Sequence, residues 1–230
     1  PREEIGEYLA FIEYLYGHNF TLLGFREYRF SEKKGAVKSQ TVRGSSLGLL
    51  SDEIRPVYIS ETEDGLPQDL QKLRRELPLL FVSKVNKLST VHRPVPLDAV
   101  AIKRFDRKGK AVGECLFIGL FTSVTYSRSI QDIPLLRLKT RKVSDMCGFR
   151  PGSHNQKALN HILEKYPRDE LFQTKIKDLH KTALSIMGLQ ERQRIALYTR
   201  TDPLLRNISC LVYVPRESYN TQMRANFENI

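Results

Sequence analysis

The sequence has few cysteines and no long apolar run, and each absence excludes a class of protein. No apolar stretch approaches the roughly 20 residues that a membrane-spanning helix needs, so we expect no membrane partner. The three cysteines are odd in number and lie far apart, at Cys115, Cys147 and Cys210. This spacing argues against a disulfide framework and indicates reduced, buried thiols in a cytoplasmic protein.

Signatures of catalysis and of cofactor binding are also missing. The histidines include no pair at i, i+4, and no cysteine lies at metal-ligand spacing, so no metal site is predicted. There is no G-x-G-x-x-G, and the segment Arg43–Leu50 lacks the lysine and the spacing of a phosphate loop. No Ser-His-Asp set can be assembled. We therefore assign no catalytic, cofactor-binding or metal-binding residue to this chain.

What is present is an ordinary folded composition with a strong positive charge. The 230 residues are 40% hydrophobic and 27% charged, which is enough for one large or two small domains. The net charge of +11 invites a nucleic-acid partner, but the basic clusters at Lys103–Lys110 and Arg137–Lys142 carry no interleaved aromatic residues. Solvated faces explain the charge better. The chain begins without Met and stops within an expected helix, so we interpret it as a piece of a longer protein.

Three apolar runs of strand length predict the central sheet. They are Leu79–Val85, Leu97–Phe105 and Ala111–Phe121, and a short polar turn with one glycine joins the last two into a hairpin. The last run is apolar on both faces, which is typical of a strand in the middle of a covered sheet.

The segments before these runs predict further elements of the same domain. An amphipathic helix over residues 3–16 presents Ile5, Leu9, Ile12 and Tyr16 and ends at Gly17. The other expected elements are a strand at Asn19–Phe30 with a bulge at Gly24, strands at Ala36–Val42 and Pro56–Ser60, and a helix at Leu66–Leu77. Residues 1–127 therefore form an α+β domain in our interpretation, with a mostly antiparallel, PAS-like sheet and helices on one face.

A helical connector is expected at residues 128–167, with one helix from Pro134 to Cys147 and another that begins at the capping box Ser153–Gln156. From Arg168 to the end the pattern changes. Glu170–Thr174 fits a strand or the start of a helix. A helix ending at Gly188, strands at Arg194–Arg200 and Arg206–Val214, and a helix at Tyr219–Ile230 follow. The expected apolar face of the two strands carries Leu197 on the first and Ile208 and Cys210 on the second. If Glu170–Thr174 is a strand, residues 168–230 form a ferredoxin-like β-α-β-β-α unit that lacks its last strand.

A polar cluster near the central sheet is the candidate effector site. His92 and Arg93 precede Asp98 closely, and a bidentate Arg93 contact would hold the carboxylate of an amino acid. The alternative is an internal Arg93–Asp98 pair that braces the turn between them. Asp202 and Asn207, at the turn between the last two strands, complete the set of candidate effector-binding residues.

Several phrases in the sequence resemble a known family. They are HNFTLLGFREY (residues 18–28), STVHRPVPLDAVAIKRFDRKGKAVGECLFIGLFTS (89–123), KALNHILEKYPRDELFQT (157–174), LQERQRIALYTRTDP (189–203) and SCLVYVPRESYNTQMR (209–224). Together they resemble the N-terminal half of the large bacterial NAD-specific glutamate dehydrogenases. The likeness runs in order along nearly the whole chain.

The resemblance implies a role as well as a fold. Enzymes of that family oxidise L-glutamate to 2-oxoglutarate and ammonium with NAD, and their catalytic domain lies far C-terminal of such a segment. No catalytic residue of the family maps onto this chain. The resemblance implies a non-catalytic segment with a PAS-like domain and an ACT-like, ferredoxin-like domain. Its expected partners are the rest of the same polypeptide, further copies in a homo-oligomer and an amino-acid effector. A purely structural scaffold and a nucleic-acid-binding module are the alternatives.

Overall fold

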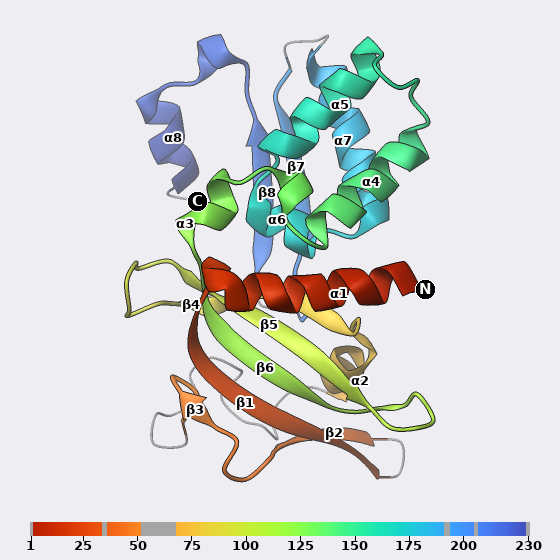
Figure 1. Ribbon diagram of the computed structural model, residues 1–230. Helices are drawn as coiled ribbons and strands as arrows, with labels where there is room; N and C mark the ends of the chain where they lie inside the picture. The colour runs from red at the N-terminus through yellow and green to blue at the C-terminus, as the bar shows by residue number, and fades with distance from the viewer. Residues whose placement is uncertain (1, 34–35, 52–67, 191–193, 205–206, 229–230) are drawn as a thin grey trace.

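A computed structural model describes residues 2–33, 36–51, 68–190, 194–204 and 207–228 of the chain (Figure 1). The predicted strand at Pro56–Ser60 lies outside the described residues. The helices are α1 (Arg2–Tyr14), α2 (Gln68–Glu76), α3 (Ser123–Ser127), α4 (Leu136–Cys147), α5 (His154–Lys165), α6 (Arg168–Gln173), α7 (Ile176–Gln190) and α8 (Thr221–Glu228). Short helical turns are η1 (Leu15–Asn19), η2 (Ile130–Asp132) and η3 (Arg216–Ser218). The strands are β1 (Phe20–Lys33), β2 (Ala36–Thr41), β3 (Leu47–Gly48), β4 (Leu80–Leu88), β5 (Pro96–Phe105), β6 (Ala111–Phe121), β7 (Ala196–Thr201) and β8 (Ile208–Tyr213).

The main sheet is antiparallel and has the order β2-β1-β6-β5-β4, with β3 paired to β1. Strand β6 is central, as its two apolar faces predicted: Ile118 belongs to the core on one face and Phe121 to the core on the other. The register of β1 against β6 shifts between Leu22 and Gly24, so the predicted bulge is confirmed. A side chain at Gly24 would collide with Ile118, which explains why glycine stands at the bulge. The α+β class is therefore confirmed.

Helices cover both faces of this sheet, which corrects the prediction of helices on one face. One core joins α1 and the connector helices to Val82, Val100 and Phe121 of the sheet. The other core lies on the opposite face around Tyr28 and Ile118. Figure 1 shows α1 running across the upper end of the sheet and the helical part above it.

Helix α2 is held to its face of the sheet by a buried ionic cluster. Lys103 and Glu114 are cross-strand partners on β5 and β6, and their side chains form an ion pair. Arg74 of α2 donates from Nε to Glu114 Oε1 at 2.6 Å, and Lys103 Nζ donates to the carbonyl oxygen of Arg74 at 2.6 Å. All three residues are buried, and the Arg74 guanidinium lies over the Tyr28 ring. The cluster thus joins α2 to the two central strands.

Helix α1 packs through a different face from the predicted one. Phe11 and Tyr14 are buried, and Phe11 contacts the rings of Phe121 and Phe172. The predicted apolar stripe faces solvent instead: Ile5, Leu9, Ile12 and Tyr16 are 56%, 58%, 40% and 91% exposed. Two apolar faces compete on this helix, and the aromatic one wins because large rings bury the most area.

The end of α1 also differs from the prediction. The helix ends at Tyr14 and passes into η1, and the left-handed residue there is His18 (φ 65°) rather than Gly17 (φ −74°). Glycine was expected because it enters the left-handed region without cost, but His18 takes that conformation here.

The second half of the chain is a group of helices, α4 to α7, followed by the antiparallel pair β7-β8. Residues Glu170–Thr174 are not a strand: α6 spans Arg168–Gln173, so the first strand of the predicted β-α-β-β-α unit is absent from this position. Pro167 precedes the helix, and Asp169 and Glu170 lie in its first turn, where carboxylates favour helix formation. These residues at its start therefore explain why α6 is a helix.

Two smaller expectations about these helices are also corrected. Helix α7 continues past Gly188 to Gln190. The capping box is half formed. Ser153 Oγ accepts from the backbone N–H of Gln156 at 3.2 Å, but the Gln156 side chain donates to Ser144 Oγ at 2.8 Å instead of returning to Ser153.

The β7-β8 pair presents the opposite face from the one predicted. Tyr198 and Tyr213 pack against the core and contact each other edge to face, whereas Leu197 and Ile208 of the predicted apolar face are exposed. Both faces are apolar, and the tyrosines turn inward because Tyr198 Oη can also hydrogen-bond Ser185 Oγ of α7 at 2.8 Å. The three cysteines are free, but none is buried as predicted: Cys115 and Cys147 are half-buried and Cys210 is exposed.

Candidate effector site

A buried carboxylate at the edge of the sheet is the centre of the site. Asp98 of β5 is the cross-strand partner of Lys84 on β4, and Lys84 Nζ lies 2.6 Å from Asp98 Oδ1. The other carboxylate oxygen accepts from the backbone N–H of Phe121 at 2.9 Å. Burial raises the pKa of Asp98, and the Lys84 charge opposes this increase only in part. The strand register therefore gives Asp98 its partner.

His92 and Arg93 lie apart from the carboxylate that they were predicted to accompany. Both side chains are exposed in the loop before β5, and His92 has a left-handed backbone (φ 62°). Arg93 Nη2 donates to the carbonyl oxygen of Phe121 at 3.0 Å. The ion-pair partner of Asp98 is Lys84 rather than Arg93, so the alternative of an internal Arg93–Asp98 pair is not formed. Arg93 and Asp98 instead hold the two sides of one residue, Phe121.

Helix α6 brings two more carboxylates to this edge. Asp169 Oδ2 lies 3.2 Å from Lys84 Nζ, and Asp169 Oδ1 accepts a hydrogen bond from Tyr126 Oη at 3.0 Å. Burial raises the pKa of Tyr126, and the nearby Asp98 and Asp169 charges add to this effect. Tyr126 therefore stays a neutral donor between the end of the sheet and α6.

Glu170 pairs with the β7-β8 hairpin. It accepts two hydrogen bonds from Arg200, at 2.7 Å from Nε and 2.8 Å from Nη2. This two-point contact with Glu170 raises the pKa of Arg200. The third guanidinium nitrogen of Arg200, Nη1, is covered and has no partner among the described residues.

Some of these residues line a cleft of about 360 Å³, whereas His92, Arg93, Asp98 and Tyr126 are not among its lining residues. The sheet contributes Lys84, α6 contributes Asp169 and Glu170, and the hairpin contributes Arg200 and Asn207. Two cations and two carboxylates on three different elements are suited to a zwitterion, since each end of such a ligand finds a group of opposite charge. Asn207 is thus placed with the site, and sequence reasoning missed Lys84, Asp169, Glu170 and Arg200. A lysine within the apolar run Leu79–Val85 was the available signal for Lys84.

Asp202 is used by the fold. It is completely buried, and its carboxylate accepts from Ser83 Oγ of β4 at 3.3 Å and from the backbone N–H of Leu204 at 3.0 Å. Its own N–H donates to the carbonyl oxygen of Asn207 at 2.9 Å. Asp202 therefore fastens the hairpin turn to the edge of the sheet, beside the cleft.

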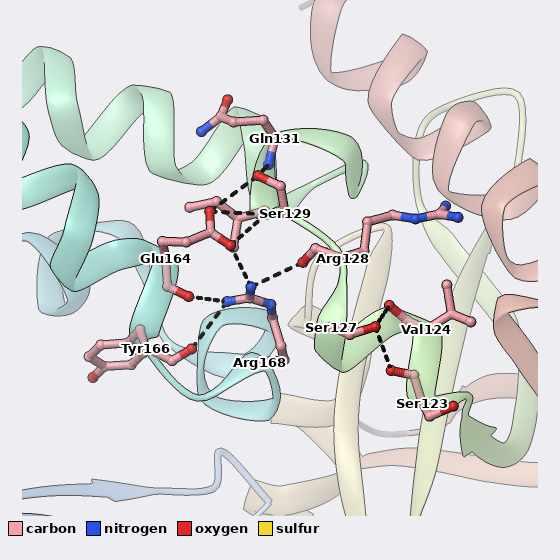
Figure 2. A network of polar contacts seen from close by, with 10 residues as sticks. Ser123, Val124, Ser127, Arg128, Ser129, Gln131, Glu164, Tyr166 and Arg168 are labelled. Carbon is pink, nitrogen blue, oxygen red and sulfur yellow. Dashed lines mark hydrogen bonds and ion pairs between the residues drawn. The ribbon is translucent and has the colours of Figure 1, made fainter.

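A second polar network joins the segment that follows α3 to helices α5 and α6 (Figure 2). Arg168 Nη2 donates to the carbonyl oxygen of Arg128 at 3.1 Å and to Glu164 Oε1 at 2.7 Å. Glu164 also accepts from Ser129 Oγ at 3.2 Å and from the backbone N–H of Ile130 at 3.3 Å. Figure 2 shows this Glu164–Arg168 pair enclosed by the segment that leaves α3. A movement of α6 would therefore also move the segment that follows α3.

The described residues contain no group of three or more His, Cys, Asp or Glu side chains placed to hold a metal ion. Within the same residues, none of the helices combines the length and the apolar character needed to cross a membrane.

Family models identify the second half of the chain. Residues 133–192 match the model described as glutamate dehydrogenase, helical motif 1, and residues 196–230 match the glutamate dehydrogenase ACT2 domain. The first match covers α4 to α7, and the second covers the β7-β8 pair and α8. The two-stranded sheet is compatible with an ACT-like unit. The predicted domain boundaries at residues 127 and 167 stay predictions.

Curated proteins match along almost the entire chain. The NAD-specific glutamate dehydrogenase of Halomonas elongata is 36% identical over 224 residues, 97% of this chain and 14% of that protein. The Pseudomonas aeruginosa protein of the same name is 36% identical over 230 residues, 100% of this chain and 14% of that protein. The Mycobacterium tuberculosis protein of that name is 27% identical over 229 residues, 100% of this chain and 13% of that protein.

The fold and these matches define an α+β chain built of a sheet domain, a helical motif and an ACT-type end. The chain is related along its length to one segment of the NAD-specific glutamate dehydrogenases, and the resemblance predicted from the sequence is confirmed. The chain spans about 14% of the length of the two relatives at 36% identity.

Proposed function

We propose that this chain is a non-catalytic regulatory and assembly segment of an NAD-dependent glutamate dehydrogenase. In the whole protein, L-glutamate, NAD and water would give 2-oxoglutarate, ammonium and NADH at a site outside this chain. NAD would bind there too. The whole protein would act in the cytoplasm as a homo-oligomer. The similarity to NAD-specific glutamate dehydrogenases over the full chain supports this proposal.

The observation that carries the regulatory role is the position of the cleft. Its walls come from three parts of the chain: β4 of the main sheet, α6 of the segment that matches the helical motif, and β7-β8 of the segment that matches the ACT2 domain. A ligand bound there contacts all three at once. A ligand shifts a conformational equilibrium only by its difference in affinity between the two states, and couplings between sites are typically about 1–3 kcal/mol. We propose an amino acid as this effector.

The chemistry of the cleft suits the two charged ends of an amino acid. Its carboxylate would compete for the Arg200 guanidinium or the Lys84 ammonium, and its ammonium would compete for Asp169 or Glu170. Each contact would compete with an existing ion pair, so binding would loosen α6 from the sheet or from the hairpin. That competition is the proposed switch.

The test uses the full-length dehydrogenase that contains this segment. Activity is measured against the concentration of each of the twenty amino acids for the native protein and for Arg200→Lys, which cannot make the two-point contact. Arg216→Lys, at an exposed arginine of η3, is the matched control. We expect the amino-acid concentration that gives half of the effect on activity to rise at least tenfold in Arg200→Lys and to stay unchanged in the control. The absence of any response in the native protein would contradict effector sensing.

A second candidate function is assembly without a ligand, and the exposed stripe on α1 favours it. Ile5, Leu9, Ile12 and Tyr16 form a contiguous apolar face, which marks a contact surface more often than a solvent face. The particle mass of the full-length protein carrying Leu9→Glu should fall, whereas Glu13→Gln on the same helix should leave it unchanged. Equal masses would remove this candidate. Nucleic-acid binding has only the +11 charge in its favour, and such binding would have to weaken steeply with salt.

A further inference from the structure

A second cavity, of about 560 Å³, lies next to the end of α6. It lies between α1, strand β4, helix α4 and the junction of α6 with α7. Its walls are mainly apolar, and the side chains that provide them include Tyr8, Leu80, Val82, Leu136, Phe172 and Ile176. Such a cavity selects a ligand with an apolar body.

The polar groups in this cavity have a surplus of positive charge. Its lining includes four lysines, Lys139, Lys142, Lys175 and Lys177, and two acids, Glu4 and Asp178. Glu4 is already paired with Lys142 at 2.5 Å. This balance favours a ligand that brings a negative charge.

Lys139 is the lysine of this cavity whose ammonium binds backbone carbonyls. Its ammonium donates to the carbonyl oxygens of Leu171, Phe172 and Thr174 at 2.5, 2.9 and 2.9 Å. Its hydrogen-bond partners among the described residues are thus carbonyls, without a carboxylate. Burial lowers the pKa of Lys139 to about 8, and the Arg200 charge adds to the effect. An anion in the cavity would supply the missing counter-charge.

Thr174 is the second polar group. It lines the cavity and is 4% exposed, and its Oγ1 has no hydrogen-bond partner among the described residues. A buried hydroxyl without a partner costs about 1–3 kcal/mol. Rotation about χ1 to another staggered rotamer would turn this hydroxyl toward a ligand oxygen. Thr174 follows α6 directly, so it lies at the carbonyl group that Lys139 binds.

We propose that this cavity binds a small carboxylic acid with an apolar body. The body would pack against Leu80, Val82 and Phe172. The carboxylate would accept a hydrogen bond from the Thr174 hydroxyl and would be stabilised by the positive charge of Lys139, whose three N–H groups stay on the carbonyls. The shared chemistry is an apolar chain on a carboxylate, whether it comes from a free acid or from an apolar amino acid. The site is separate from the charged cleft, although Gln173 lines both. If no carboxylic acid binds in this cavity, the regulatory role proposed for the charged cleft is unaffected.

Calorimetric titration of the 230-residue chain tests the ligand class. The probes are 4-methylpentanoate, the uncharged 4-methylpentanamide and L-leucine. We expect the carboxylate to bind at least tenfold more tightly than the amide. Tighter binding of L-leucine than of 4-methylpentanoate would support the site and identify an amino acid as the source. Equal binding of acid and amide, or no binding of either acid, would overturn the proposal.

Two variants locate the binding. Thr174→Val keeps the shape of the side chain and removes a hydroxyl that has no partner, so we expect a stable protein that binds 4-methylpentanoate about tenfold more weakly. Lys139→Met removes the charge and should weaken binding further, whereas Lys157→Met, at an exposed lysine of α5, should have no effect. Unchanged affinity in Thr174→Val would overturn the site even if Lys139→Met does not fold.

Discussion

Replacing Glu114 by Gln should destabilise the protein more than any other single removal of a charge from the main sheet. Glu114 is 2% exposed and binds both Lys103 and Arg74. The substitution keeps the size of the side chain but leaves two buried cations without their common anion. Removing one partner of a buried ion pair costs about 3–5 kcal/mol. For a domain of 150–250 residues this corresponds to a decrease in melting temperature of about 6–20 °C.

A matched control exists on the surface of the same sheet. Glu32 also accepts from an arginine of α2 and from a lysine, Arg75 at 2.9 Å and Lys110 at 3.1 Å, but its side chain is 42% exposed. Solvent screens exposed ion pairs, so Glu32→Gln should leave the urea midpoint and the melting temperature almost unchanged. Equal effects of Glu32→Gln and Glu114→Gln would refute the argument from burial.

The pH dependence of Glu114→Gln gives a further check. Burial opposes ionisation of Glu114, but the charges of Arg74 and Lys103 outweigh it and lower the pKa below the usual value of 4.5. A lowered pKa stabilises the folded state above the unfolded pKa, and this contribution is lost as the pH falls through the folded pKa. The stability difference between the native protein and Glu114→Gln should therefore persist down to pH 4.5 and narrow below it. A difference that grows in acid would contradict the pairing.

Three further predictions concern other parts of the chain. Gly119→Ala on β6 should abolish folding, measured by circular dichroism, because its Cβ would overlap the β1 backbone, whereas Gly6→Ala on α1 meets open space and should stabilise the helix by up to about 1 kcal/mol. Because the pKa of Lys139 is about 8 in the folded protein, the unfolded lysine keeps its proton to a higher pH, and the free energy of unfolding should rise by about 3 kcal/mol between pH 8 and 10.5. This rise should be absent in Lys139→Met. A free energy of unfolding that stays constant over this range in the native protein would contradict the lowered pKa. Glu170→Gln should increase hydrogen exchange of the β7-β8 amides, since Arg200 loses its two-point partner, and unchanged protection would show that the pair does not hold the hairpin.

Local pattern was sufficient for the main sheet. Apolar runs of strand length predicted β5 and β6, the double apolar face predicted that β6 is central, and Gly24 predicted the bulge in β1. Each of these signals lies within a few residues, and one short turn joins β5 to β6. The sequence resemblance also predicted the family, because phrases such as YPRDELFQ and CLVYVPR are unusual.

The partners of the site could not be predicted in the same way. Asp98 and Asn207 were named as candidates, but Lys84, Glu170 and Arg200 come from β4, α6 and β7, and only the register and the packing of α6 place them together. Asp202 was named for a ligand and instead fastens a turn. A charged residue has the same appearance in a sequence whether its partner is a ligand, solvent or another strand.

The sequence by itself predicted the longer helices and strands, left α6 open between strand and helix, and did not predict the short elements β3 and α3. It also showed that α1 and the β7-β8 pair carry many apolar residues. The tertiary structure alone decided which face of each is buried. In both elements two apolar faces competed for burial. The aromatic residues of α1 face inward because Tyr14 hydrogen-bonds Thr125, 111 residues away. Those of the β7-β8 pair face inward because Tyr198 hydrogen-bonds Ser185 on α7. The periodicity of apolar residues shows that a face is apolar, but it does not show which distant residues pack against that face.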